Sequence, residues 1–103
     1  MNLTDHFSLG ELTFSSTGTR LGIDNTPNDE IVENLKRTAE LLEKVRKLFN
    51  NNPLHIDSGY RCPELNTKIG GAKTSAHLEG RAADFTCSSL GTPYQLAKIT
   101  LSK

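Results

Sequence analysis

The 103-residue sequence has no tryptophan, only two cysteines and no excess of charge of either sign. Two cysteines are too few to indicate a disulfide scaffold, so we interpret Cys62 and Cys87 as thiols. Twelve Lys and Arg residues balance twelve Asp and Glu residues. This balance leaves no electrostatic reason to expect nucleic acid or an anionic membrane as a partner, and it leaves the oligomeric state open.

Long apolar runs are absent as well. No stretch approaches the roughly 20 apolar residues that span a bilayer, and residues 1–6 lack the basic start and apolar run of a secretory signal. We therefore expect synthesis in the cytoplasm without a signal peptide, and no membrane partner. The length and the 35% hydrophobic content suit one small domain, residues 1–103, with a single core.

Helical periodicity is clearest between positions 27 and 50. Apolar residues recur there at spacings of three, four or seven, as expected for one buried helix face: Ile31, Leu35, Leu42, Val45 and Phe49. Ser8 and Glu11 fit a capping box, which predicts a short helix near the start of the chain. Residues 15–25 are rich in Gly, Ser and Thr and predict a loop.

Further along the chain, short elements follow one another. Residues 54–57 and 82–86 predict strands, and residues 63–69 predict a short helix that ends at Gly70 and Gly71. Residues 92–95 fit a helix start, with Leu96, Ile99 and Thr100 continuing one face. The expected fold class is α+β: a single domain with helices packed on one face of a small antiparallel sheet.

The stretch from Ser75 to Asp84 carries the clearest chemical signal. His77 and Asp84 lie seven positions apart, with a glycine and small residues between them. A neutral imidazole and an ionised carboxylate are both good zinc ligands. We predict a partly buried strand over residues 82–86 that carries Asp84 inward and would hold its carboxylate still. The alternative is a hydrogen-bonded turn without a metal.

The flanking segments extend this motif. Residues 56–66, 69–72 and 75–84 together resemble the D-alanyl-D-alanine carboxypeptidase family of zinc peptidases, in particular its small phage-type members that cut peptidoglycan stem peptides. Residues 7–13 and 22–27 are also similar to theirs. The resemblance runs from about Phe7 to Phe85 and implies the same α+β fold.

The resemblance also implies roles for individual residues. It implies His77 and Asp84 as Zn²⁺ ligands and places Ser75 near the substrate. Arg61 takes the position of an arginine that contacts the scissile carbonyl or a substrate carboxylate, which makes it the candidate catalytic and substrate-binding residue. A guanidinium suits this role because it stays charged and donates in a planar fork. The alternative is a surface arginine that closes a turn.

One part of the family pattern is missing from the sequence. Relatives complete the site with a later Glu-x-Trp-His segment, whose histidine is the third ligand and whose acid is the general base. This sequence has no tryptophan and no histidine after His77, so we expect a C-terminally truncated domain. His6, His55, Cys62 and Cys87 remain open as substitute ligands, although His55 would lie on the strand face opposite Leu54 and Ile56.

These observations lead to two hypotheses. The first is a zinc metallopeptidase, or a fragment of one, that hydrolyses peptidoglycan stem peptides as a D-Ala-D-Ala carboxypeptidase or an endolysin-like enzyme, acting at the bacterial cell wall once a phage or prophage system releases it. The second is a catalytically inactive relative that binds cell-wall peptides. Nothing in the sequence calls for a structural protein of a phage particle or a signalling domain.

Overall fold

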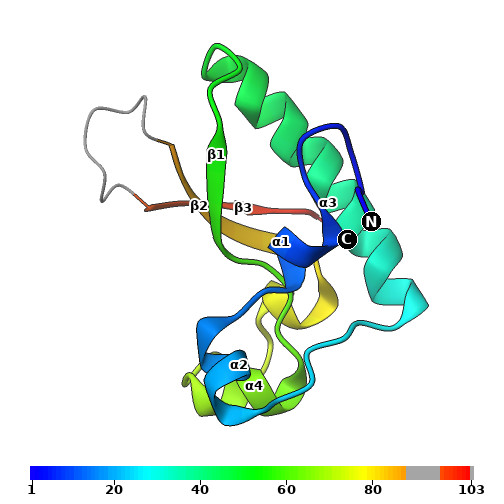
Figure 1. Ribbon diagram of the computed structural model, residues 1–103, viewed down its shortest axis with the longest axis vertical. Helices are drawn as coiled ribbons and strands as arrows, with labels where there is room; N and C mark the ends of the chain where they lie inside the picture. Colours follow the sequence, from blue (N-terminus) through cyan, green and yellow to red (C-terminus); the bar gives the residue numbers. More distant parts are fainter. Residues whose placement is uncertain (88–95, 103) are drawn as a thin grey trace.

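The fold is a twisted antiparallel sheet with helices on one face and a smaller helical lobe at one end (Figure 1). The structure is a computed structural model and describes residues 1–87 and 96–102. The elements are, in chain order, α1 (Leu9–Thr13), α2 (Ser16–Leu21), α3 (Asp29–Leu48), β1 (Leu54–Ser58), α4 (Pro63–Lys68), the 3-10 helix η1 (Ala76–Glu79), β2 (Ala82–Cys87) and β3 (Leu96–Thr100).

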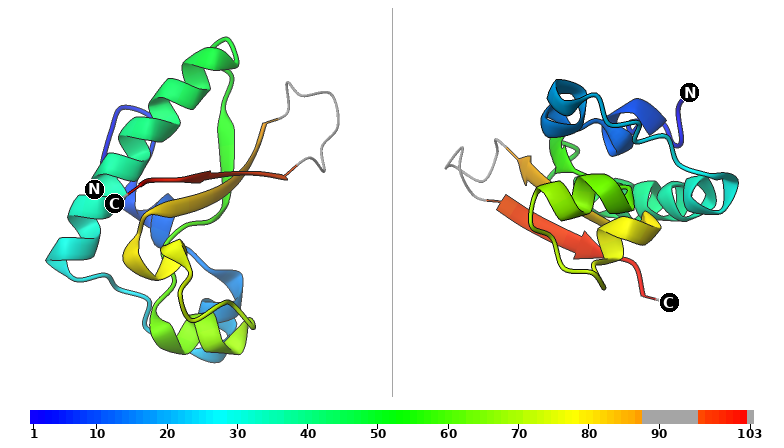
Figure 2. Two further views of the ribbon diagram at one scale, coloured as in Figure 1. Left: turned by 180° about the vertical axis from the view of Figure 1, so that it is seen from behind. Right: turned by 90° about the horizontal axis from the view of Figure 1, so that it is seen from below.

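The three strands lie in the order β1-β2-β3, and both pairs are antiparallel. The long helix α3 and the short helix α1 lie against the sheet, whereas α2, α4 and η1 lie toward one end of it (Figure 2). This arrangement confirms the α+β fold class. None of the helices in the described ranges is both long and apolar enough to cross a bilayer.

The hydrophobic core lies between α3, α1 and one face of the sheet. Helix α3 buries Leu35, Ala39 and Leu42 at helical spacing, and β2 contributes every second residue, as a strand with one buried face should. The other main buried members of the core are Leu3, Phe7, Leu12, Leu54, Tyr60, Ala83, Phe85 and Cys87. Cys62 and Cys87 are thiols and do not form a disulfide with each other.

The predicted start of α1 is confirmed. Ser8 is the N-cap, its side chain accepts a hydrogen bond from the Glu11 backbone, and the Glu11 side chain accepts one from the Ser8 backbone. The helix over 29–48, the strand at 54–57 and the helix after Pro63 are confirmed as well. Gly70 adopts a left-handed conformation just after α4, as its predicted role in ending that helix requires.

The prediction of a loop over residues 15–25 is wrong, because α2 occupies Ser16–Leu21. Ser15 caps this helix, accepting a hydrogen bond from Gly18 N at 3.1 Å, and Gly22 ends it in the left-handed conformation. The Ser and Gly residues that suggested a loop therefore act as the two caps of a six-residue helix.

The helical continuation predicted for Leu96, Ile99 and Thr100 is also wrong, and its predicted start at 92–95 lies outside the described residues. Residues 96–100 form β3, which pairs with β2. Ala97 and Ile99 pack against the core, and Lys98 between them is exposed, which is the alternation of a strand. The residues therefore fit both a helix and a strand, and pairing with the backbone at the edge of β2 favours the strand.

Candidate active site

The structure brings His77 and Asp84 together. His77 lies on η1, Asp84 lies on β2, and the two elements are in contact. His77 Nε2 is 3.3 Å from Asp84 Oδ2; the histidine side chain is fully buried and that of Asp84 is 21% exposed. The predicted strand is confirmed, but Asp84 does not point into the hydrophobic core, because the flanking Ala83 and Phe85 occupy the core face.

The η1 turn that carries His77 is held from two sides. Ser75 caps the turn, its Oγ accepting a hydrogen bond from His77 N at 3.2 Å. On the other side, Thr38 Oγ1 donates to Gly80 O at 2.8 Å and Asn34 Nδ2 donates to Glu79 O at 2.9 Å. Ser75, expected near the substrate, thus also fixes the backbone of a candidate ligand.

Sequence reasoning did not identify Asn34 and Thr38 as part of the site. They lie four positions apart on α3 and so share one side of the helix. Thr38 is fully buried within the apolar face that also includes Leu35 and Leu42. A hydroxyl within an otherwise apolar helix face was the available signal, because a buried hydroxyl needs a hydrogen-bond partner.

The hydrogen bond of the second ring nitrogen sets the tautomer of His77. Nδ1 lies 2.6 Å from Gly59 O. A carbonyl only accepts hydrogen bonds, so Nδ1 carries the proton and the neutral ring presents a lone pair at Nε2. That buried Nε2 has no hydrogen-bond partner and faces the Asp84 carboxylate. Two electron-rich atoms at this distance repel each other, and a cation bound to both would remove the repulsion.

A proton is disfavoured as that cation. Burial lowers the pKa of the His77 imidazole below its ordinary value, and the charges of Arg61 and Lys98 lower it further. The Gly59 hydrogen bond and the Asp84 carboxylate oppose this shift without reversing it. The imidazole is therefore neutral near pH 7, which is the form that binds a metal.

The geometry fits zinc. Nitrogen and oxygen ligands at tetrahedral zinc lie about 2.0–2.1 Å from the ion, which places two of them roughly 3.3–3.4 Å apart. The observed Nε2–Oδ2 distance is 3.3 Å. The Gly59 carbonyl completes the arrangement, because a metal-binding histidine usually donates its other N–H to a carbonyl or carboxylate.

The structure does not bring a third ligand to this pair from the described residues. No group of three or more His, Cys, Asp or Glu side chains in residues 1–87 and 96–102 is placed to share a metal ion. His6 lies 2.7 Å from Glu43, and His55, on the outer strand face as predicted, lies 3.4 Å from Asp57. Cys62 and Cys87 pack with the hydrophobic core.

Arg61 lies beside the same pair. Its backbone N donates to His77 O at 3.1 Å, and its side-chain Nε is buried without a hydrogen-bond partner. Burial lowers the pKa of the guanidinium, and the negative charge of the Asp84 carboxylate opposes this shift. The guanidinium remains charged near pH 7 and can donate to a carbonyl or carboxylate oxygen.

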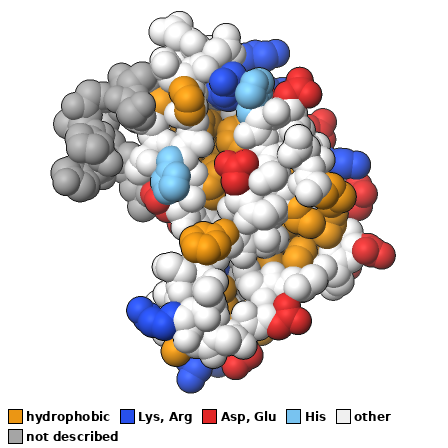
Figure 3. Space-filling view, viewed as in Figure 1, with side chains coloured by type: hydrophobic (Ala, Val, Ile, Leu, Met, Phe, Trp, Pro, Cys, Tyr) orange, Lys and Arg blue, Asp and Glu red, His pale blue; other side chains and the backbone are white. Residues whose placement is uncertain are grey.

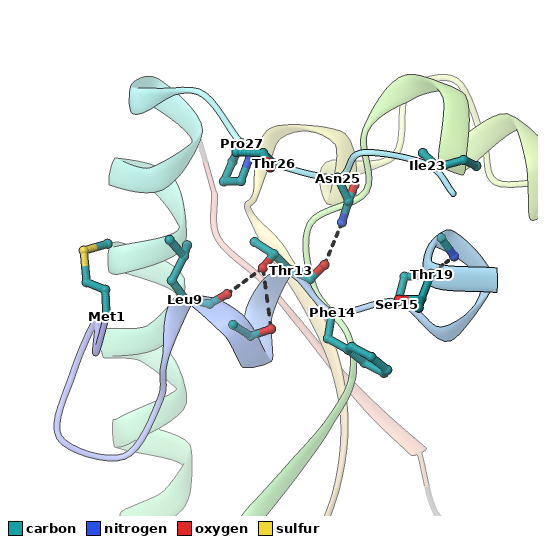
Figure 4. A pocket seen from close by; sticks show the side chains of 12 residues that line it. Met1, Leu9, Thr13, Phe14, Ser15, Thr19, Ile23, Asn25, Thr26 and Pro27 are labelled. Carbon is teal, nitrogen blue, oxygen red and sulfur yellow. Dashed lines mark hydrogen bonds between the residues drawn. The ribbon is translucent and has the colours of Figure 1, made fainter. Parts of the chain in front are cut away.

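Asn25 fixes the backbone on both sides of Arg61, a role that sequence reasoning did not assign. Its Nδ2 donates to Tyr60 O at 3.0 Å, and its Oδ1 accepts from Cys62 N at 2.7 Å. The same Nδ2 donates to Thr13 O at 2.8 Å, as drawn in Figure 4. One amide side chain thus joins the Arg61 loop to the end of α1.

Two cavities lie near the N-terminal helices. One, of about 400 Å³, lies between α1, α2 and residues 23–27 (Figure 4), and its lining includes none of the predicted site residues. The other, of about 200 Å³, includes Arg61 in its lining. Of these two cavities, the second is therefore the one that adjoins a predicted site residue.

Comparisons with known proteins agree with the geometry. Residues 5–102 match the model of a family described as Peptidase M15. The chain is also 34% identical over 50 residues to a zinc D-Ala-D-Ala carboxypeptidase of Streptomyces albus G. That match covers 48% of this chain and 20% of the relative, so the chain spans about a fifth of the length of the curated relative that it matches.

Proposed function

The chain belongs to the peptidase M15 family, and from this premise we propose that it is a zinc-dependent peptidase acting on peptidoglycan stem peptides, as a D-Ala-D-Ala carboxypeptidase or an endolysin-like enzyme. The observation that carries the proposal is the buried lone pair of His77 Nε2, which lies 3.3 Å from Asp84 Oδ2 and has no hydrogen-bond partner. The similarity to a zinc D-Ala-D-Ala carboxypeptidase supports the substrate class.

Each residue has a physical role in this proposal. His77 and Asp84 would hold zinc, which when bound supplies Lewis-acid polarisation of a carbonyl and activation of water. Arg61 donates to the scissile carbonyl oxygen or to a substrate carboxylate, and its charge stabilises negative charge that develops there. Ser75 keeps the His77 backbone in place through its cap.

Zinc content tests the metal site directly. Elemental analysis of the purified, dialysed protein should find about one zinc per chain, and His77→Ala and Asp84→Asn should lose it. His55→Ala is the matched control, because His55 is 78% exposed and the described residues do not group it with His77 and Asp84 around one metal ion. A protein without zinc, or a His77→Ala variant that keeps it, would contradict the proposed ligands.

Activity tests the rest of the proposal. Release of D-alanine or of cross-link peptides from purified cell walls should depend on zinc and should be lost in His77→Ala. Arg61→Lys keeps the charge but not the planar fork, so we expect a reduced rate with zinc retained. Hydrolysis that continues in His77→Ala would refute a zinc mechanism in which His77 holds the metal.

One observation favours a second function, that of a catalytically inactive relative which binds cell-wall peptides. A catalytic zinc usually has three protein ligands, whereas the described residues bring two together. Calorimetric binding of a stem peptide without any release of products would select this alternative.

The place of action would follow from the substrate. Peptidoglycan lies outside the cytoplasmic membrane, so a protein that acts on it must reach the bacterial cell wall. Release by a separate agent, as in a phage or prophage system, is the route that we propose. Lysis of cells only when a membrane-permeabilising protein is co-expressed would support it, and lysis by the protein alone would contradict it.

A further inference from the structure

The Arg61 side chain has an open side and a buried side. It lines the cavity of about 200 Å³, and Figure 3 shows the surface hollowed between the sheet and the helical lobe. Its Nε, in contrast, is buried and has no hydrogen-bond partner among the described residues. A guanidinium acts on a substrate oxygen only if its fork is held in one orientation. The buried side is where a group that holds it would lie.

A second buried polar atom without a partner belongs to Asn66. This residue lies on α4 and is 3% exposed. Its Nδ2 donates to Ala72 O at 3.0 Å. Because a carbonyl oxygen only accepts, the amide nitrogen must face Ala72, which fixes Oδ1 on the other side. That Oδ1 is buried and has no hydrogen-bond partner among the described residues, an arrangement that is costly unless a donor reaches it.

Gly71 brings the two side chains together. A Cβ at position 71 would overlap Asn66 Oδ1 and would lie 3.1 Å from Arg61 Nη1. Both atoms therefore lie over the same side of the Gly71 backbone, in the space that the missing side chain leaves. Gly71 N also donates to Asn66 O at 2.9 Å, which holds this backbone against α4. An unpaired acceptor thus lies beside the guanidinium whose Nε is unpaired.

We propose that Asn66 is a positioning residue for Arg61: its Oδ1 accepts a hydrogen bond from the guanidinium and keeps the planar fork directed at the cavity. A guanidinium has donors on several sides, so one can bind the amide oxygen while others remain for a ligand. The inference rests on the proposed function, in which Arg61 binds the substrate. It adds a residue that acts through Arg61 without touching the substrate.

The neutral amide suits this role because of the charges nearby. The Asp84 carboxylate attracts the guanidinium. Without another acceptor, Arg61 would turn toward Asp84 and compete with a metal ion for that carboxylate. A second carboxylate at position 66 would hold Arg61 as well, but its charge would repel an anionic substrate. An amide oxygen holds the guanidinium and adds no net charge.

Nitrogen-15 NMR of the Arg61 Nε–H group tests the contact without a substrate. Arg61→Lys removes the signal and so assigns it. We expect the wild-type proton to exchange slowly with water, and Asn66→Leu, which is similar in size but cannot accept, to exchange about tenfold faster, as for the loss of one hydrogen bond. Asn66→Asp keeps an acceptor oxygen and loses the Ala72 bond, so it should retain slow exchange.

A double-mutant cycle shows whether Asn66 acts through Arg61. Calorimetry measures the affinity of the zinc-loaded protein for N-acetyl-D-alanyl-D-alanine. We expect Asn66→Leu to weaken binding about three- to tenfold in the wild-type background and to change nothing in the Arg61→Ala background. A purely structural role of Asn66 would weaken binding equally in both backgrounds.

Asn52→Leu is the matched control. Asn52 Nδ2 donates to Phe49 O, and Asn52 precedes β1, whereas Arg61 follows the other end of that strand. This change should leave the exchange at Arg61 and the peptide affinity as in the wild type. Thermal unfolding of each variant shows whether the fold is intact.

The possible failures are distinguishable. Exchange at Arg61 in the wild type as fast as at Arg37, which is exposed on α3, would overturn the positioning role even if Asn66→Leu does not fold. Unchanged exchange in a folded Asn66→Leu protein would overturn it as well, and both results leave the proposed function standing. A wild-type protein that binds no peptide would contradict the proposed function, while the exchange measurement still decides whether Asn66 holds Arg61.

Discussion

At the scale of single residues, the candidate site depends on a close approach between the N-terminal segment and the loop after β1. Tyr60 N donates to Leu12 O at 2.7 Å, and the neighbouring Gly59 carbonyl accepts a hydrogen bond from His77 Nδ1. A Cβ at position 59 would overlap the Leu12 carbonyl. Gly59 therefore lets α1 approach while its own carbonyl sets the tautomer of the candidate ligand.

Gly59→Ala tests this close approach. The added methyl group meets backbone that cannot rotate away, so we expect a loss of about 1–3 kcal/mol in the free energy of unfolding. Denaturant unfolding measures the loss, and zinc affinity should fall with it because the Gly59 carbonyl moves.

Gly10→Ala is the matched control for this change. A Cβ there has Ser8 Oγ as its nearest neighbour, at 3.8 Å. Because alanine favours helix, Gly10→Ala should be neutral or stabilising by about 0.5–1 kcal/mol. A Gly59→Ala protein as stable as wild type would show that the backbone can separate without cost.

At the scale of elements, helix α3 has two structural roles. One face supplies much of the core through Leu35, Ala39 and Leu42. Asn34 and Thr38 on the same helix donate to the carbonyls at the end of η1, those of its last residue Glu79 and its C-cap Gly80. The helix thus supports the sheet and also holds the segment that carries His77.

Thr38→Val tests the second role of α3. Valine has nearly the shape of threonine but cannot donate to Gly80 O, so that buried carbonyl loses this hydrogen bond. We expect a loss of about 1–3 kcal/mol in the free energy of unfolding. Zinc affinity, measured by competition with a chelator, should also fall.

Thr38→Ser separates the hydrogen bond from packing. Serine keeps the hydroxyl and removes one methyl group, so zinc affinity should stay close to wild type even if stability falls. If Thr38→Val binds zinc as tightly as Thr38→Ser does, then α3 contributes to packing but does not position the ligand.

At the scale of the whole molecule, hydrogen bonds join the N-terminal segment to helix α3. His6 N donates to Glu43 Oε2 at 2.8 Å, and His6 Nδ1 lies 2.7 Å from Glu43 Oε1. The same segment continues into α1 and Phe14, which line the cavities. Loss of this tie should therefore loosen the wall of the candidate site as well as the fold.

The pH dependence of stability tests the tie. Burial raises the pKa of the Glu43 carboxyl, but interactions with His6 and Thr4 together outweigh this effect, so the native pKa lies below the ordinary value of 4.5. The contribution is present above the unfolded-state pKa and is lost as pH falls through the native pKa. Glu43→Gln should thus cost about 1 kcal/mol near pH 7, and the difference should shrink below about pH 4.

Glu40→Gln is the control for this pH series. Glu40 lies on the same helix and is exposed, so its replacement should change stability by less than about 0.5 kcal/mol. A Glu43→Gln difference that stays constant from pH 7 to pH 3 would mean that the carboxylate charge does not contribute.

Much of the fold could be predicted from the sequence because its signals are local. The apolar spacing from Ile31 to Phe49 specifies a helix with one buried face, and Ser8 with Glu11 specifies a cap within four residues. His77 and Asp84 stood out by chemistry and spacing before their geometry was known. Such patterns act between neighbours in the chain, so a single sequence contains all of the information they need.

Two elements could not be predicted because local patterns were ambiguous. Leu96, Ile99 and Thr100 fit a helix face, and Ala97 with Ile99 fits a strand; the open edge of β2 decides for the strand. In α2, Ser and Gly residues occur at both caps of a short helix, where composition alone indicated a loop. The choice between helix and strand at residues 96–100 depends on pairing with a neighbouring strand, and the choice between helix and loop at residues 16–21 depends on capping.

The sequence by itself determined which helix supports the core, through its apolar spacing. Its residues and the family resemblance that they carry also supplied the candidate metal ligands His77 and Asp84 and the candidate arginine Arg61. Only the tertiary structure decided how that chemistry is arranged. The Gly59 carbonyl sets the tautomer of His77, which is 18 positions away in the sequence. The Thr38 hydroxyl holds the carbonyl of Gly80, which is 42 positions away. Contacts between such distant residues arise from packing of the whole chain, so no local pattern can specify them.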